Sequence, residues 1–269
     1  MAALAGTPRP LGPRRARALH RAFVGAAAIA MVTAGCGDEG AGAGASAGGS
    51  RTITVLAAAS LTEAFTEMGR QFEASNPVDV RFGFGASSSL AQQVVDGAPA
   101  DVLATADEQT IQRVADRHAQ PPAVFAQNRL AIAVRRGNPE RIESLADLAR
   151  PGLVVVLCAP EVSCGRLARE ATGRASVEVP ARSFEPDVKG VVSKISLGEA
   201  DAGIVYVTDI RATGQLDEVA IPPEHNVTAR YPIVPVRGGK SPQLARAFIE
   251  HVRSPSGRAV LAEAGFQAP

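Results

Sequence analysis

The chain has 269 residues, a formal net charge of +1, three cysteines and no tryptophan. A charge this close to zero, with arginines that are not clustered near aromatic residues, argues against a nucleic-acid partner. Because aromatic residues make up only 4% of the chain, we expect a core of Val, Ile, Leu and Ala.

The first 35 residues have the pattern of a secretory signal peptide. Arginines precede an apolar stretch, residues 22–32, which is too short to span a membrane. The segment ends in Thr33-Ala34-Gly35-Cys36, where small residues precede a cysteine as they do in a bacterial lipobox. We therefore expect residues 1–35 to be removed and Cys36 to carry lipid. A plain signal peptide that is cleaved near this point is the alternative.

Residues 36–51 are rich in glycine, alanine and serine and cannot bury a core, so they predict a flexible tether. The tether would hold an extracytoplasmic body close to the cell membrane. The remaining residues, 52–269, are enough for one large domain or two smaller lobes.

The first part of this body alternates strands with helices. Residues 52–59 form a continuous apolar run that is typical of a buried strand, and apolar residues then recur at helical spacing. Two more strand–helix pairs follow, with strands at 78–84 and 100–105 and a last helix that Asp107 caps. This order is typical of an α/β fold with a parallel sheet.

The α/β pattern occurs a second time, and the chain ends in two helices that have no sheet of their own. The sequence predicts strands near 130–134, 153–157, 202–207, 219–221 and 231–236, with helices from about 163, 187, 241 and 254. We expect two Rossmann-like lobes with a ligand cleft between them. The first lobe comprises 52–127 plus 238–269 and the second 128–237, with chain crossings near 126–134 and 230–237.

Two serines lie where an apolar strand turns into a helix: Ser60 and Ser87. A helix N-terminus leaves backbone N–H groups unpaired and carries partial positive charge, so it attracts anions. Together the serines suggest a site for a small oxyanion that neutral donors hold. The alternative is that both are only N-caps, and Ser60-x-x-Glu63 fits a capping box.

Two further helices begin at Ser163 or Cys164 and at Asp187 or Val188, in the second lobe. In open α/β sheets, ligands bind outside the carboxyl ends of the strands, where such helices begin. If the lobes close, we expect all four helix starts to meet at one pocket.

At this point the chain resembles the molybdate-binding proteins of bacterial ABC importers, which are two-lobed periplasmic binding proteins of type II. The resemblance rests on five blocks in order: 53–61, 84–91, 97–107, 185–188 and 203–209, of which Ala57-Ala-Ala-Ser-Leu61 and Gly97-Ala-Pro-Ala-Asp101 are the most specific. It implies that the ligand is molybdate or tungstate, bound by Ser60, Ser87, Cys164, Val188 and Tyr206. It also implies a membrane permease as partner, no cofactor and no catalysis, and we expect a monomer.

Cys158 and Cys164 remain as a pair if Cys36 carries lipid. In an oxidising compartment these two can form a disulfide. Two free thiols or a metal site are the alternatives, but a C-x5-C spacing with no nearby histidine is a poor metal site, and we expect no metal cation ligands.

Other functions compete with molybdate capture. The chain could be a receptor for another oxyanion such as sulfate, or for a metal or an organic acid. A serine hydrolase that uses Ser60, Ser87 or Cys164 as nucleophile would need an adjacent, oriented base. The chain has no Gly-x-Ser-x-Gly elbow, and its few histidines lie outside the blocks quoted above.

Overall fold

The structure is a computed structural model that describes residues 51–269. The predicted signal peptide, the predicted lipid-bearing Cys36 and all of the predicted tether except Arg51 lie outside these residues. Arg51 is the first residue of β1 (Arg51–Ala58), so the first strand begins one residue earlier than expected. None of the helices that are described has the length and apolar composition needed to cross a membrane.

The first lobe is built on three parallel strands: β1, β2 (Val78–Gly85) and β3 (Val102–Ala104). The helices α1 (Thr62–Ser75), α2 (Ser87–Val95) and α3 (Glu108–Gln112) follow these strands in turn. The alternation that the sequence predicts is therefore confirmed. Short 3-10 turns occur at Ala59–Leu61 and Ala115–Arg117.

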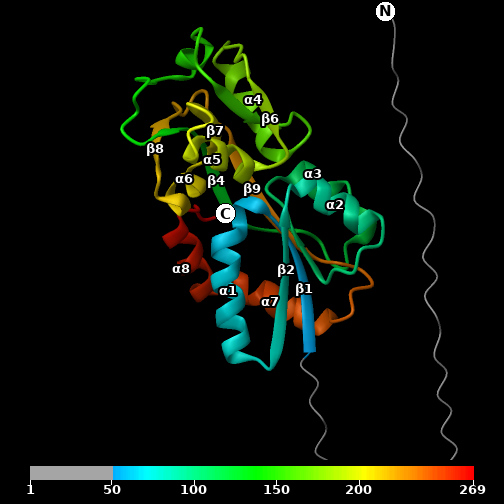
Figure 1. The fold of residues 1–269 in the computed structure, drawn as a ribbon. Coiled ribbons are helices and arrows are strands. Elements are labelled where there is room, and N and C mark those ends of the chain that lie inside the picture. Colours follow the sequence, from blue (N-terminus) through cyan, green and yellow to red (C-terminus); the bar gives the residue numbers. More distant parts are fainter. Residues whose placement is uncertain (1–50) are drawn as a thin grey trace, which may run out of the picture. The chain divides into compact units, whose positions relative to one another are not determined.

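The second lobe holds the other part of the nine-stranded sheet. Its strands are β5 (Val155–Cys158), β6 (Ser183–Glu185), β7 (Ala202–Tyr206) and β8 (Leu216–Ala220). Its helices are α4 (Ser163–Arg174), α5 (Val188–Ser196) and α6 (Val207–Thr213), and a 3-10 turn spans Leu145–Ala149. Figure 1 shows these elements grouped apart from β1, β2 and α1.

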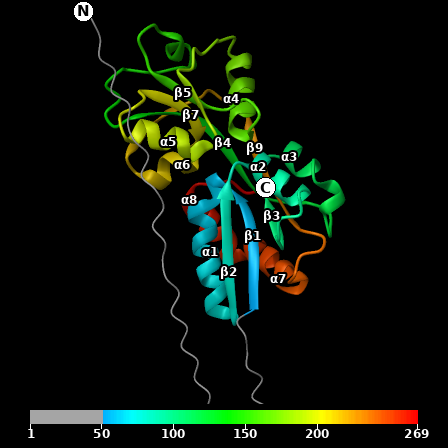
Figure 2. The same ribbon diagram turned by 45° about the vertical axis from the view of Figure 1, so that its right-hand side comes forward.

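Two long strands, β4 (Ala123–Arg135) and β9 (Thr228–Pro235), connect the lobes (Figure 2). Residues 123–129 of β4 pair with β9, whereas residues 130–135 pair with β7 and β8. The strand order is therefore β2-β1-β3-β9-β4-β7-β5-β6. Because β9 brings the chain back from the second lobe, it runs antiparallel to β3, and the sheet is mixed rather than purely parallel. The boundary predicted at 127–128 lies inside β4, close to this change of partner.

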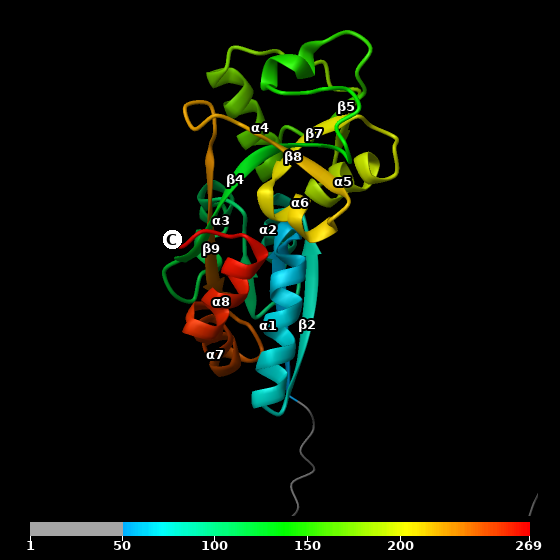
Figure 3. The ribbon, with the colours of Figure 1, turned by 90° about the vertical axis from the view of Figure 1, so that its left-hand side faces the viewer.

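The last two helices, α7 (Pro242–Arg253) and α8 (Pro255–Ala264), fold back on the first lobe as expected. Both pack beside α1 (Figure 3). The buried residues are mostly Val, Ile, Leu and Ala, as predicted, but phenylalanines gather under these helices. Phe248 of α7 lies 6.0 Å from Phe65 and 5.5 Å from Phe72, measured between ring centroids. This phenylalanine cluster thus anchors α7 to α1 within the first lobe.

Candidate functional site

A small cavity of about 20 Å³ lies where the starts of four helical segments meet. All five residues predicted to bind the ligand line it, and they come from both lobes: Ser60, Ser87, Cys164, Val188 and Tyr206. The rest of the lining is Ala58, Ala59, Gly85, Ala86, Ala106, Val162, Ser163 and Asp187. A cavity of this size holds a small ion or one or two water molecules, and it has no room for an extended organic acid.

Ser60 lies in the 3-10 turn that precedes α1 and is buried. Its hydroxyl hydrogen-bonds to Tyr231 Oη at 2.9 Å, and it makes no side-chain cap. The residue that precedes α1 is Leu61, and Glu63 binds Lys189 instead of the Ser60 backbone. The capping-box alternative for Ser60 is therefore wrong, because the 3-10 turn places Ser60 one residue before Leu61, which holds the cap position of α1.

Ser87 is the first residue of α2, and the residue at the cap position is Ala86. The Ser87 hydroxyl accepts a hydrogen bond from the Ala106 amide at 3.0 Å, so it does not cap its own helix. Since that bond uses a lone pair of Oγ, the hydroxyl hydrogen remains available to an acceptor in the cavity.

The second lobe brings the first turns of α4 and α5 to the cavity. Cys164 is the second residue of α4, and Val188 is the first residue of α5. Amide groups in the first turn of a helix have no carbonyl partner within that helix. The side chain of Val188 is buried, as its apolar stripe predicts. What both residues offer to the cavity is therefore a backbone N–H group near the positive end of a helix dipole.

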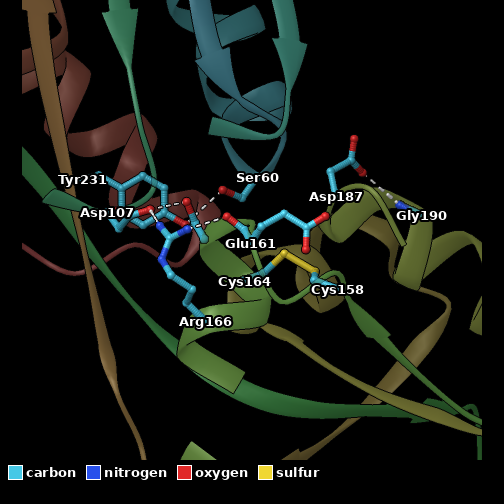
Figure 4. Close-up of a disulfide and its surroundings, with 10 residues drawn as sticks. Ser60, Asp107, Cys158, Glu161, Cys164, Arg166, Asp187, Gly190 and Tyr231 are labelled. Atoms are coloured by element: carbon cyan, nitrogen blue, oxygen red, sulfur yellow. Dashed lines mark hydrogen bonds and ion pairs between the residues drawn. A yellow bond between two sulfur atoms is a disulfide. The ribbon is translucent and has the colours of Figure 1, made fainter. Parts of the chain in front are cut away.

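The structure joins Cys158, the last residue of β5, to Cys164 in a disulfide (Figure 4). The loop between them folds tightly on α4, because a Cβ added at Gly165 would lie 2.0 Å from the Ala159 carbonyl oxygen. The close approach at Gly165 was not predicted from the sequence. The one signal in the sequence was a glycine directly after Cys164, at the start of the helix.

Tyr206 ends β7 and is only 1% exposed. Its hydroxyl has no hydrogen-bond partner among residues 51–269. Burial raises the pKa of Tyr206 well above its usual value, so the hydroxyl stays protonated and can donate. A buried hydroxyl without a partner is costly, and this one lines the cavity, where a bound acceptor would satisfy it.

Asp187 is the one charged residue among the described residues that line the cavity. Its carboxylate caps α5 by accepting from the Gly190 amide at 3.1 Å, as Figure 4 shows. No lysine or arginine lines the cavity within residues 51–269. Apart from the Asp187 carboxylate, which caps α5, the described lining therefore offers neutral donors and helix N-termini.

Asp107 caps α3, as expected, by accepting from the Thr110 amide at 2.6 Å. The same carboxylate also accepts from Ser163 and from Arg166, two residues of α4. This contact between the two lobes was not predicted, because the cap alone was enough to explain Asp107.

The surroundings of the two serines do not resemble a hydrolase site. The hydrogen-bond partners of Ser60 and Ser87 in the described chain are Tyr231 and the Ala106 amide, and neither is a base. Between residues 51 and 269, no three His, Cys, Asp or Glu side chains are grouped as metal ligands.

Comparisons with known proteins place the chain among related sequences. Residues 53–267 match the family described as bacterial extracellular solute-binding protein. The chain is 42% identical to a molybdate-binding protein, ModA, of Mycobacterium tuberculosis over 225 residues, which cover 82% of this chain and 86% of that protein.

Solved structures share the fold. The periplasmic molybdate-binding protein of Azotobacter vinelandii matches with a TM-score of 0.72 at 19% identity, covering 81% of this chain and 99% of that one. The sulfate-binding protein SubI of Mycobacterium tuberculosis matches with a TM-score of 0.74 at 22% identity, covering 81% and 87%. The matched proteins are solute-binding proteins, which confirms the expectation that this chain is not an enzyme.

Proposed function

Since the chain belongs to the bacterial extracellular solute-binding proteins, and within them matches a molybdate-binding protein at 42% identity, we propose that its cavity captures molybdate for an ABC importer. Ser60 and Ser87 donate through their hydroxyl and amide groups, Cys164 and Val188 through their amides, and Tyr206 through its hydroxyl. The lobes close around the anion by bending at β4 and β9, and the permease reads the closed form.

The observation that carries this proposal is the Tyr206 hydroxyl, which is buried, protonated and without a partner where the helix N-termini of both lobes meet. Such a site lacks only an acceptor. An oxyanion supplies acceptors on every side, whereas a metal cation would face donors that repel it. A neutral organic ligand would not use the partial positive charge of the helix N-termini.

Neutral donors are strong enough for this task. A hydrogen bond to a charged group is worth about 1.5–3 kcal/mol net. Five to seven of them therefore supply roughly 8–20 kcal/mol before the costs of ordering, whereas micromolar to nanomolar binding needs about 8–12 kcal/mol. An arginine is not required.

A set of neutral hydrogen-bond donors also discriminates between anions. Phosphate retains a proton near neutral pH, and its O–H would meet a donor that cannot receive it. Molybdate and tungstate are fully ionised and nearly equal in size, so we propose that the site binds both. Sulfate is smaller and would leave the hydrogen bonds stretched.

Lipid on Cys36 and a flexible tether would keep the binding protein, as a monomer, beside its permease. The small-residue stretch before Cys36 supports this proposal. Mass spectrometry of the exported protein would test it, since a lipidated cysteine adds the mass of its acyl chains. In the Cys36→Ser variant, we expect that mass to be absent and the protein to be released from the membrane fraction.

The binding proposal is tested by isothermal titration of the purified protein with molybdate, tungstate, sulfate and phosphate, together with thermal unfolding. We expect molybdate and tungstate to bind at micromolar or lower concentrations and to raise the unfolding temperature, while sulfate and phosphate bind much more weakly. Tight binding of sulfate with no response to molybdate would make the chain a sulfate receptor instead.

A further inference from the structure

A continuous set of buried polar side chains leads from the cavity into the connection between the lobes. Ser60 bounds the cavity in the first lobe, Tyr231 and Asn128 lie on the connecting strands β9 and β4, and Thr208 lies in the first turn of α6 in the second lobe. All four are at most 5% exposed. Polar groups this deeply buried need partners, so their hydrogen bonds constrain one another.

The contacts form a chain. Asn128 Nδ2 donates to Thr208 Oγ1 at 2.8 Å and lies 3.5 Å from Tyr231 Oη, to which it also donates. Tyr231 Oη in turn lies 2.9 Å from Ser60 Oγ. The set therefore joins a residue of the cavity to both connecting strands and to the second lobe.

The orientation of Asn128 determines the direction of these bonds. Asn128 Oδ1 accepts from the Arg129 amide at 3.0 Å, which turns the NH2 group toward Thr208 and Tyr231. An NH2 group can only donate, so Tyr231 Oη receives a hydrogen from Asn128. The single hydrogen of Tyr231 is then directed to Ser60, and the hydrogen of Ser60 is free to point into the cavity.

We propose that Tyr231, oriented by Asn128, is a positioning residue that makes Ser60 a hydrogen-bond donor toward the bound anion. This inference rests on the proposed function, since it concerns how Ser60 meets an oxyanion. In the opposite arrangement Ser60 would donate to Tyr231 and present a lone pair to the anion, which would repel it. Tyr231 itself does not line the cavity and acts only through Ser60.

The burial of Tyr231 supports this role. Burial raises the pKa of its hydroxyl far above the usual value, so the group keeps its hydrogen at every physiological pH. The ring is fixed on several sides by aromatic neighbours, Phe266 at 5.3 Å and Tyr206 at 6.1 Å between centroids. The hydroxyl therefore has a defined position and little freedom to turn away from Ser60.

A double-mutant cycle in molybdate titration tests the inference with the wild type, Ser60→Ala, Tyr231→Phe and the double variant. If Tyr231 acts through Ser60, Tyr231→Phe should weaken binding about 3- to 30-fold in the wild type and have little further effect in Ser60→Ala. Losses that multiply in the double variant would show an independent structural role and would overturn the inference. So would an unchanged affinity of Tyr231→Phe.

Two controls separate this inference from other failures. Thr172→Val removes a buried hydroxyl of α4 that binds the Arg169 carbonyl away from the cavity, and we expect it to leave the affinity unchanged. Thermal unfolding of each unliganded variant shows whether it is folded before titration. If the wild type itself fails to bind molybdate, the proposed function fails, whereas a wild type that binds with no coupling between the two residues overturns the role of Tyr231 alone.

Discussion

Arg166 Nη2 lies 2.7 Å from Asp107 Oδ2, and this ion pair joins the start of α4 in the second lobe to the start of α3 in the first. Both side chains are largely buried, at 19% and 11% exposure. The same carboxylate accepts from Ser163, which lines the cavity. A single aspartate therefore fastens the two lobes together directly beside the proposed anion site.

We expect Arg166→Met to weaken molybdate binding about 5- to 50-fold, because a buried carboxylate that loses its cation destabilises the closed arrangement of the lobes. Titration calorimetry measures the affinity, and small-angle scattering of the unliganded protein should show a larger radius of gyration. Arg70→Met removes an exposed pair with Glu67 and serves as the control. Equal affinities of the two variants would contradict this role of Arg166.

Ser87→Ala should lower the affinity for molybdate about 10- to 100-fold, because it removes one donor to the anion and leaves the Ala106 amide without its acceptor. Ser89, two positions later on the same helix, is exposed. Ser89→Ala is therefore the matched control, and it should bind as the wild type does. A loss of affinity in Ser89→Ala as large as that in Ser87→Ala would point to a defect of α2 rather than of the site.

The disulfide should contribute about 2 kcal/mol to stability in the chain-entropy account of a short closed loop. The double variant Cys158→Ala/Cys164→Ala keeps the amide of residue 164 but loses the cross-link that holds it. We expect a lower unfolding temperature and a several-fold weaker affinity for molybdate. A reducing agent should lower the unfolding temperature and the molybdate affinity of the wild type but leave those of the double variant unchanged. If complete reduction changes neither value in the wild type, the prediction is refuted.

Two glycines of α4 should respond oppositely to alanine. Gly165→Ala places a Cβ against the Ala159 carbonyl oxygen, so we expect a clear loss of stability and of binding. A Cβ at Gly173 would meet no atom within 4 Å, and Gly173→Ala should raise stability by up to about 1 kcal/mol through helix propensity. Chemical denaturation measures the free energy of unfolding of both variants. Equal changes in Gly165→Ala and Gly173→Ala would show that the close approach at Gly165 is relaxed in solution.

Asp209 should give the stability a distinct dependence on pH. Its carboxyl group is buried, 3.2 Å from Lys189 Nζ. Burial raises the pKa of this carboxyl to about 6. The positive charge of Lys189 lowers the pKa and offsets part of this rise, whereas the negative charge of Glu63 raises it further. Between about pH 4 and pH 6 the folded protein retains this proton while the unfolded chain has lost it. The contribution of this group to stability therefore falls as the pH rises through this window, by about 3 kcal/mol.

Asp209→Asn should remove that component, so the free energy of unfolding, measured by denaturant titration at several pH values, should fall less between pH 4 and pH 6. Asp96→Asn removes an exposed carboxylate at the end of α2 and should leave the wild-type slope unchanged. A slope for Asp209→Asn that equals the wild-type slope would show that the carboxylate ionises normally in the fold.

Local patterns in the sequence were enough for the alternation of strands and helices and for the four helix starts at the cavity, whereas Tyr206 was expected only from the resemblance to the molybdate-binding family. Ser60 and Ser87 each follow an apolar strand that leads into a helix, and Cys164 and Val188 lie at helix starts marked by Ser163 and Asp187. The chemistry of helix N-termini then predicts an anion site. The capping box at Ser60 was misleading for the same reason, because a local pattern does not show that a 3-10 turn intervenes before α1.

What the sequence by itself determined is each segment's own conformation, because hydrophobic periodicity and helix-start residues act over a few positions. Only the tertiary structure decided that Tyr231 meets Ser60 across 171 positions and that Arg166 meets Asp107 across 59. These contacts depend on how β4 and β9 bring the lobes together, and burial then makes each polar group find a partner. No local pattern records which distant side chain that partner will be.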